Sequence, residues 1–377
     1  MVTLGQGFRP YLLAHLKTIL QDETPQYKIE PAGFLNLLSN QSKPTVLRLD
    51  TSKGHYQTAQ IKYKQRYTED FTSDTPSCDE TNTQAYREAS VDLASYRQIA
   101  IHIEDETIAK YTDDASEVLN GGTPPTPLMN EFIDEVMNAA SALLGAVNND
   151  LQTIASMNIG VNAVTGNNNA TPININRSLM ALPLDDGMTK IISDYSINLG
   201  SGIPQVYGSG LFYNYVLQQK SKSTDLRGYN TAIDVEGIKF YYDIKSANIL
   251  GTNYICVCQP NSLQWVEYMR YTGFKAGTKP GASQFFTLPL PMQVGSEIVP
   301  VLFDVQLRYN DCAATFTDAY YGNQITLEKG YNLILSKTSG LFCIPADAYR
   351  GTDRLKGNRG TLLYEIDNNC DNCVADI

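Results

Sequence analysis

The chain has 377 residues and a net charge of −11, from 29 basic and 40 acidic side chains. This length is enough for two or three domains with a substantial core. The acidic balance argues against a surface built mainly to hold nucleic acid, because phosphate binding needs clustered lysine and arginine. No apolar run approaches the roughly 20 residues that span a bilayer, and the N-terminal segment lacks the pattern of a signal peptide.

The first 44 residues contain two short helical patterns, YLLAHLKTILQ and AGFLNLLSN, separated by Pro25 and Pro31. A segment of this size cannot bury a core of its own. We therefore expect it to pack on something else, because short isolated helices are marginal in water.

The next part, residues 45–67, is predicted to form a strand, a turn and a second strand. Within it, AQIKYKQRYTEDF places basic side chains on one face and apolar or aromatic ones on the other. The basic set is Lys62, Lys64 and Arg66; the apolar set is Ile61, Tyr63 and Tyr67.

Alternation returns after residue 85, so residues 57–68 and 86–103 are predicted to pair as a long antiparallel hairpin. Its projection is on the order of 35 Å. The intervening residues 68–84 carry five acids and no base, which is typical of an exposed loop. Such a hairpin is marginally stable alone, so either the same chain or a neighbouring copy must support it.

Apolar residues at a spacing of three and four from Met129 to Ile154 predict a single helix of about 30 residues, roughly 45 Å long. Beyond it, helical patterns in 188–199 and 210–219 alternate with strands in GIPQVYG, GIKFYYDI and NYICVCQ. This alternation is typical of an α/β layer domain. From about Ile298 the pattern is strand-rich.

The seven cysteines, an odd number in a long chain, do not indicate a disulfide framework. Cys370 and Cys373 form one C-x-x-C pair, which is half of a zinc site, and we interpret them as reduced thiols. Cys256 and Cys258 share one face of a predicted strand and are expected to be small core residues.

We find no set of residues at catalytic or metal-binding spacing, and predict no enzyme, no cofactor and no metal site. The three histidines, at 15, 55 and 102, have no partners at ligand spacing. The carboxylate pairs Asp113–Asp114 and Asp185–Asp186 are interpreted as solvated. The 24 tyrosines could form a stacking platform for sugars or bases, but core and interface positions account better for most of them.

The order of arm, long hairpin, long helix, α/β domain and late strands resembles the major capsid protein of tailed bacteriophages, which has the Hong Kong 97-type α+β fold. Four phrases are similar to capsid proteins of short-tailed and crAss-like phages of Bacteroidetes hosts. They are IKYKQRYTEDFTSDTPSCDE, YRQIAIHIEDETIAKY, FYYDIKSANILGTNYICVCQPNSLQWVEYMRY and LFCIPADAYRGTDRLKG.

The resemblance implies an arm (1–44), an extended loop (45–115), a peripheral domain with a spine helix (116–165), an axial domain (166–300) and late strands shared by both domains (301–377). It implies self-assembly through pentamers and hexamers into an icosahedral virion shell. The shell would enclose double-stranded DNA without sequence-specific binding and without a membrane. Portal, scaffolding and cement proteins would be further partners, and the host bacterial cytoplasm the place of synthesis.

For the hairpin, this reading places Ile61, Tyr63 and Tyr67 against a neighbouring subunit. The three basic residues would face acidic groups of another neighbour, or solvent. A hairpin packed on its own chain is the alternative. Two other functions stay open: an encapsulin-type nanocompartment shell with the same fold, and a soluble carbohydrate-binding or hydrolytic protein that uses the tyrosines and acids.

Overall fold

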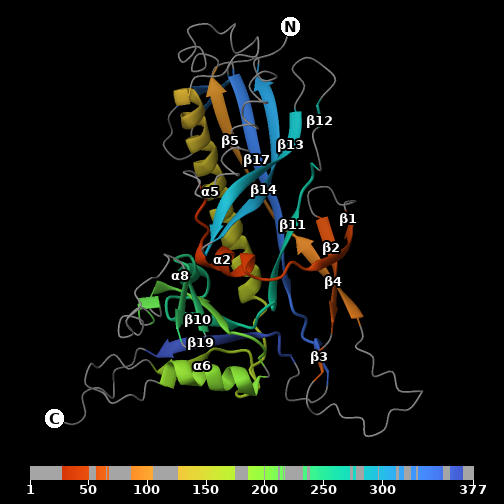
Figure 1. Cartoon of the computed structure of the whole chain (residues 1–377), viewed down its shortest axis with the longest axis vertical. Helices are drawn as coiled ribbons and strands as arrows, with labels where there is room; N and C mark the ends of the chain where they lie inside the picture. Colours follow the sequence, from red (N-terminus) through yellow and green to blue (C-terminus); the bar gives the residue numbers. More distant parts are fainter. Residues whose placement is uncertain are drawn as a thin grey trace, which may run out of the picture. The chain divides into compact units, whose positions relative to one another are not determined.

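In this computed structural model, the structure describes most of the chain between residues 28 and 367. The described residues are 28–50, 57–64, 66–67, 86–104, 126–174, 186–198, 200–210, 213–214, 216, 232–235, 238–271, 275–276, 284–295, 297–310, 314–317, 324–327, 330–350 and 357–367. The predicted α+β class is confirmed, and the elements follow the order expected for the Hong Kong 97-type fold (Figure 1).

The chain forms two compact units of interleaved segments. The first unit comprises Met1–Pro31, Ser95–Val147 and Glu267–Thr338, and the second comprises Ala32–Ala94, Asn148–Val266 and Ser339–Ile377. Three elements, α5, β11 and β17, contribute residues to both units.

The first unit contains most of a six-stranded sheet, with the order β11-β17-β14-β13-β12 and β5 paired with β17. Its strands, in chain order, are β5 (Ser95–Glu104), β11 (Leu263–Tyr268), β12 (Lys275–Ala276), β13 (Gln284–Val294), β14 (Glu297–Asn310) and β17 (Gly330–Cys343). The late strand-rich region was therefore predicted correctly. Ile29 adds a short parallel bridge to Met292 of β13.

The predicted long helix is confirmed as α5 (Thr126–Ser156), which is 31 residues long. Side chains at the predicted spacing, including Ile133, Val136, Ala140 and Leu144, are buried. Gly145 lies within the helix and does not interrupt it. The helix is thus specified by its own apolar stripe.

A second six-stranded sheet forms the centre of the second unit, in the order β6-β19-β10-β7-β9-β8. Its strands are β6 (Thr171–Asn174), β7 (Gln205–Gly208), β8 (Ala232–Val235), β9 (Ile238–Tyr242), β10 (Tyr254–Cys258) and β19 (Thr361–Asp367). Cys256 and Cys258 are buried on β10, as predicted. Helix α6 (Asp186–Ile197) contributes Ile191 and Tyr195 to the same apolar core.

The short helix α2 (Gly33–Ser39) packs on this second sheet. A Cβ atom at Gly33 would lie 1.9 Å from the carbonyl oxygen of Tyr242, so only glycine allows this approach. The Phe34 ring lies 4.6 Å from the ring of Tyr207, centroid to centroid. The expectation that this N-terminal segment packs on another part of the protein is confirmed for α2.

Four further described elements are short. They are α8 (Ser246–Ile249), the hairpin of β15 (Ala314–Thr317) with β16 (Gln324–Leu327), and β18 (Tyr349–Arg350). Within the residues that the structure describes, no helix is long and apolar enough to cross a membrane. The positions of Cys370, Cys373, His15, His55 and Asp113–Asp114, like the first predicted helix, lie outside the described residues.

Candidate assembly surface

A three-stranded antiparallel sheet, here called the hairpin sheet, is built from β1 (Thr45–Asp50), β2 (Gln57–Lys64) and β4 (Tyr86–Leu93). Strand β2 lies between the other two (Figure 1). Ile61 of β2 stands opposite Ala89 of β4, and Lys62 stands opposite Glu88. The predicted two-faced strand is therefore confirmed.

The predicted length of the hairpin is wrong. Residues 86–104 do not form one strand: β4 ends at Leu93, and β5 begins at Ser95 and pairs with β17 in another sheet. The paired stem is eight residues long, which corresponds to about 26 Å. A long two-stranded ribbon is unfavourable because it exposes its apolar face to water. The pairing of β5 with a larger sheet avoids this exposure.

The inner face of the hairpin sheet is covered by the same chain. Ala59, Ile61 and Leu93 are fully buried. A Cβ atom at Gly340 would lie 2.8 Å from the carbonyl oxygen of Asp92 and 2.9 Å from a methyl carbon of Leu93, so β17 and β4 approach closely here. The expectation that Ile61 contacts a neighbouring subunit is therefore corrected, because its own chain buries it.

Tyr63 also makes its contacts within the chain. Its ring centroid lies 6.1 Å from that of Phe342, and its hydroxyl donates a hydrogen bond to Oδ1 of Asp347 at 3.0 Å. The guanidinium nitrogen Nη1 of Arg87 donates a hydrogen bond to Oδ2 of Asp347, also at 3.0 Å. Burial, the hydrogen bond and the charge of Asp347 raise the pKa of Tyr63 to about 12. Tyr63 therefore packs on its own chain, while its expected contact with a neighbouring subunit stays a prediction, because its side chain is only partly buried.

The outer face of the hairpin sheet carries the basic residues. Lys62 and Lys64 are exposed, and their ammonium nitrogens lie 3.9 Å and 5.8 Å from the ring centroid of Tyr86, which is itself 61% exposed. Cation–π attraction to one ring gathers both charges at this end of the sheet. The sequence pattern predicted the lysines but contained no signal for Tyr86, since strand register alone brings it beside them.

Strand β1, which forms one edge of the hairpin sheet, exposes apolar side chains. Val46, Leu47 and Leu49 are 40%, 47% and 38% exposed. The pairing with β2 shifts by one residue between Val46 and Arg48, which leaves Leu47 in a bulge. Among the described strands, β1 pairs only with β2, so its outer backbone edge and its apolar side chains are uncovered there. Uncovered apolar edge strands are typical of contact surfaces.

Arg66 and Tyr67 form the short strand β3, which pairs in parallel with Tyr349 and Arg350 of β18. The backbone at these positions is thus held by the same chain. The placement of the two side chains lies outside the described residues. Their expected contact with a neighbouring subunit stays a prediction.

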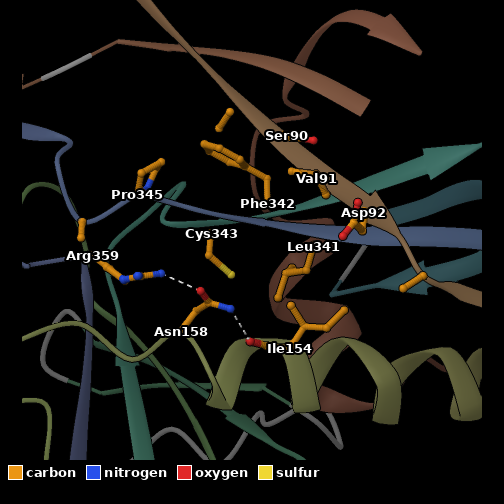
Figure 2. A pocket seen from close by; sticks show the side chains of 13 residues that line it. Ser90, Val91, Asp92, Ile154, Asn158, Leu341, Phe342, Cys343, Pro345 and Arg359 are labelled. Atoms are coloured by element: carbon orange, nitrogen blue, oxygen red, sulfur yellow. Dashed lines mark hydrogen bonds between the residues drawn. The ribbon is translucent and has the colours of Figure 1, made fainter. Parts of the chain in front are cut away.

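A cavity of about 430 Å³ lies between β4 and residues 341–346 (Figure 2). Arg359 donates a hydrogen bond to the side-chain oxygen of Asn158 at 2.6 Å, and Asn158 donates to the carbonyl of Ile154 at 2.8 Å. Burial raises the pKa of the Cys343 thiol in this cavity to about 12. The cavity therefore offers no thiolate nucleophile at neutral pH. No sequence pattern predicts it, because four separate segments line it.

His102, the histidine that the structure describes, makes a structural contact. Nδ1 of His102 on β5 lies 2.6 Å from Oδ1 of Asn332 on β17, so this histidine joins two strands. Throughout the described part of the chain, no group of three histidine, cysteine or acidic side chains is placed to hold a metal ion.

Comparison with known proteins gives structural neighbours of low sequence identity. No family model and no curated protein matches the chain. A structure from Mycobacterium phage Adephagia is similar over 94% of this chain and 97% of its own, with 11% identity and a TM-score of 0.43. The capsid structure of Cyanophage P-SCSP1u is similar over 93% and 88%, with 11% identity and a TM-score of 0.41.

A third neighbour is the virus-like particle from Pyrococcus furiosus, which is similar over 96% of each chain, with 9% identity and a TM-score of 0.33. At these identities and scores the likeness concerns the course of the chain and assigns no role to any residue. The contacts within the chain itself are the basis for inferring its function.

Proposed function

We propose that the chain is a major capsid protein with a Hong Kong 97-like fold, which self-assembles into an icosahedral shell around phage double-stranded DNA. The observation that carries the proposal is β1, an edge strand whose Val46, Leu47 and Leu49 are uncovered. A second copy would bury this apolar surface and pair with the edge that β1 leaves open among the described strands. The order of hairpin sheet, long helix, central sheet and late strands also supports it.

Within this proposal the partners are other copies of the chain, arranged as pentamers and hexamers. Portal, scaffolding and cement proteins are further expected partners, and the virion is the expected location. The domain limits given by the resemblance, its narrower link to short-tailed and crAss-like phages, and the absence of an enzymatic activity all stay predictions. The acidic net charge of −11 suits a shell that confines DNA without binding it tightly.

The proposed contacts between subunits are β1 and the outer face of the hairpin sheet. The expected contact residues from the sequence prediction remain Lys62, Tyr63, Lys64, Arg66 and Tyr67, and Tyr86 joins them because both lysines lie against its ring. Ile61 is excluded, since it is fully buried in its own chain.

Electron microscopy and sedimentation of the purified, concentrated protein test the proposal. Shells, sheets or ring-shaped capsomers are expected for the wild type. Leu47→Asp should abolish them, because a carboxylate would be desolvated at the contact. The matched control is Ile244→Asp, at an exposed apolar residue that belongs to no part of the proposed contact.

Three results would count against the proposed shell or redirect it. A wild type that remains a clean monomer at high concentration would overturn it, and a sugar-dependent rise in Tm of that monomer would favour the carbohydrate-binding alternative. Particles that enclose a protein cargo in place of nucleic acid would favour the encapsulin-type alternative.

A further inference from the structure

The outer face of the hairpin sheet has a basic end, defined here as Lys62, Lys64 and Tyr86. Lys64 and Tyr86 are cross-strand partners, and Lys62 is two residues further along the same face. Both ammonium groups lie against the Tyr86 ring, which places two positive charges on one exposed aromatic side chain. The basic end is therefore a compact cationic site with an apolar centre.

The charges of the basic end are not neutralised by nearby carboxylates. Lys62 stands opposite Glu88 in the register, yet neither lysine has an ion-pair partner among the residues that the structure describes. Tyr86 is the residue that both ammonium groups contact there. A protein with a net charge of −11 thus presents an exposed cationic site that is available to an acidic partner.

The chain itself carries a segment of matching chemistry. The acidic segment, residues 69–80 (EDFTSDTPSCDE), contains five carboxylates and no basic residue, and lies in the sequence between β3 and β4. We propose that the basic end binds the acidic segment of a second copy of this chain. The inference rests on the proposed assembly and names the electrostatic contact within it.

A contact between copies suits these groups better than one within a single chain. An exposed ion pair within one chain contributes little, because water and salt screen it. At a subunit contact the same groups lose water, set the register of the two surfaces, and are repeated in every copy. The exposed Tyr86 ring would be covered by the same contact.

Charge reversal tests the proposal in the full-length chain. The base-reversed variant carries Lys62→Glu and Lys64→Glu, and the acid-reversed variant carries Asp70→Lys, Asp74→Lys and Asp79→Lys. Each alone should lower the particle yield about tenfold or more at about 50 mM salt, because like charges then meet. A chain that carries both the base-reversing and the acid-reversing substitutions should form particles again. The control combines Lys28→Glu with Arg308→Glu, two exposed cations outside the hairpin sheet, and should assemble normally.

Mixing the two variants separates a contact between copies from one within a chain. In an equal mixture every contact between unlike copies is complementary, so particles should form that neither variant forms alone. Rescue by combining both sets in one chain, without rescue in the mixture, would place the contact inside one chain and overturn the inference. Normal assembly of both single variants would overturn it too, while leaving the proposed function intact. Failure of the wild type to assemble would instead count against the proposed function.

Discussion

The main-chain N–H of Phe34 donates a hydrogen bond to Oδ2 of Asp243 at 3.2 Å, across 209 positions of the sequence. The same oxygen accepts hydrogen bonds from Asn148 at 2.9 Å and from Gln152 at 2.7 Å. Asp243 is almost completely buried. This carboxylate, on the residue that follows β9, thus joins helix α2 to the C-terminal part of α5.

Replacing Asp243 should strongly destabilise the second unit, in which it lies. Asp243→Ala leaves three buried donors without an acceptor, and we expect the free energy of unfolding to fall by about 3–5 kcal/mol. Urea denaturation of the monomeric fraction measures the change. Asp134→Ala, at an exposed carboxylate on α5, is the control and should stay within about 0.5 kcal/mol of wild type. Equal stability of the two variants would show that the buried carboxylate does not hold these elements together.

The buried Lys337 predicts an order of stabilities for two variants. Its ammonium group pairs with Glu267, donates to the carbonyl of Leu302 at 2.6 Å, and lies 5.4 Å from the centroid of the Phe303 ring. Glu267→Ala removes the carboxylate that pairs with this buried cation and should lower the free energy of unfolding by about 3–5 kcal/mol. Lys337→Met removes the cation itself and should have a smaller effect, because Glu267 is partly exposed and can reach water. Thermal denaturation checks the order, and the reverse order contradicts the assignment.

Two glycine-to-alanine changes should act in opposite directions. At Gly340 the new methyl group would press on Asp92 and Leu93 of β4, so we expect a loss of about 1–3 kcal/mol. At Gly145, inside α5, nothing lies within 4 Å of the new methyl group, and helix propensity predicts a gain of about 0.5–1 kcal/mol. The two variants are controls for each other in one denaturation series. Stabilisation by Gly340→Ala would mean that β4 and β17 are not in close contact there.

The contact of Tyr63 with Asp347 predicts a pH dependence. Burial first, and then the hydrogen bond, raise the pKa of Tyr63 from its ordinary 10.0 to about 12. Between these two pH values the folded chain keeps a proton that the unfolded chain loses. The stabilising contribution of Tyr63 is therefore full below pH 10 and is lost as the pH rises towards 12.

Comparison of wild type with Tyr63→Phe measures this effect. The advantage of the wild type in unfolding free energy should shrink from pH 10 to pH 12, and NMR titration of labelled tyrosine should give the raised pKa directly. Asp347→Asn should lower the pKa only in part, because burial is the larger cause. A Tyr63 that titrates near pH 10 in the wild type would contradict the observed contact.

Elements that depend on local periodicity could be predicted from the amino-acid sequence. The 3.6-residue stripe of α5, the two-residue alternation of β2 and the shared face of Cys256 and Cys258 each follow from backbone geometry, which makes equivalent side chains point the same way. The predicted elements therefore exist, with bounds close to those expected.

The partner of each element depends on long-range contacts, which became visible in the folded chain. The alternation of residues 86–104 is the same whether they form one strand or two, and the division at Ala94 depends on β2 and β17, which lie far away in the sequence. For the same reason, Ile61 could not be assigned to its own chain, nor Lys337 and Asp243 to buried polar contacts. Burial and hydrogen bonding are properties of long-range contacts, and a local pattern specifies a face without specifying what covers it.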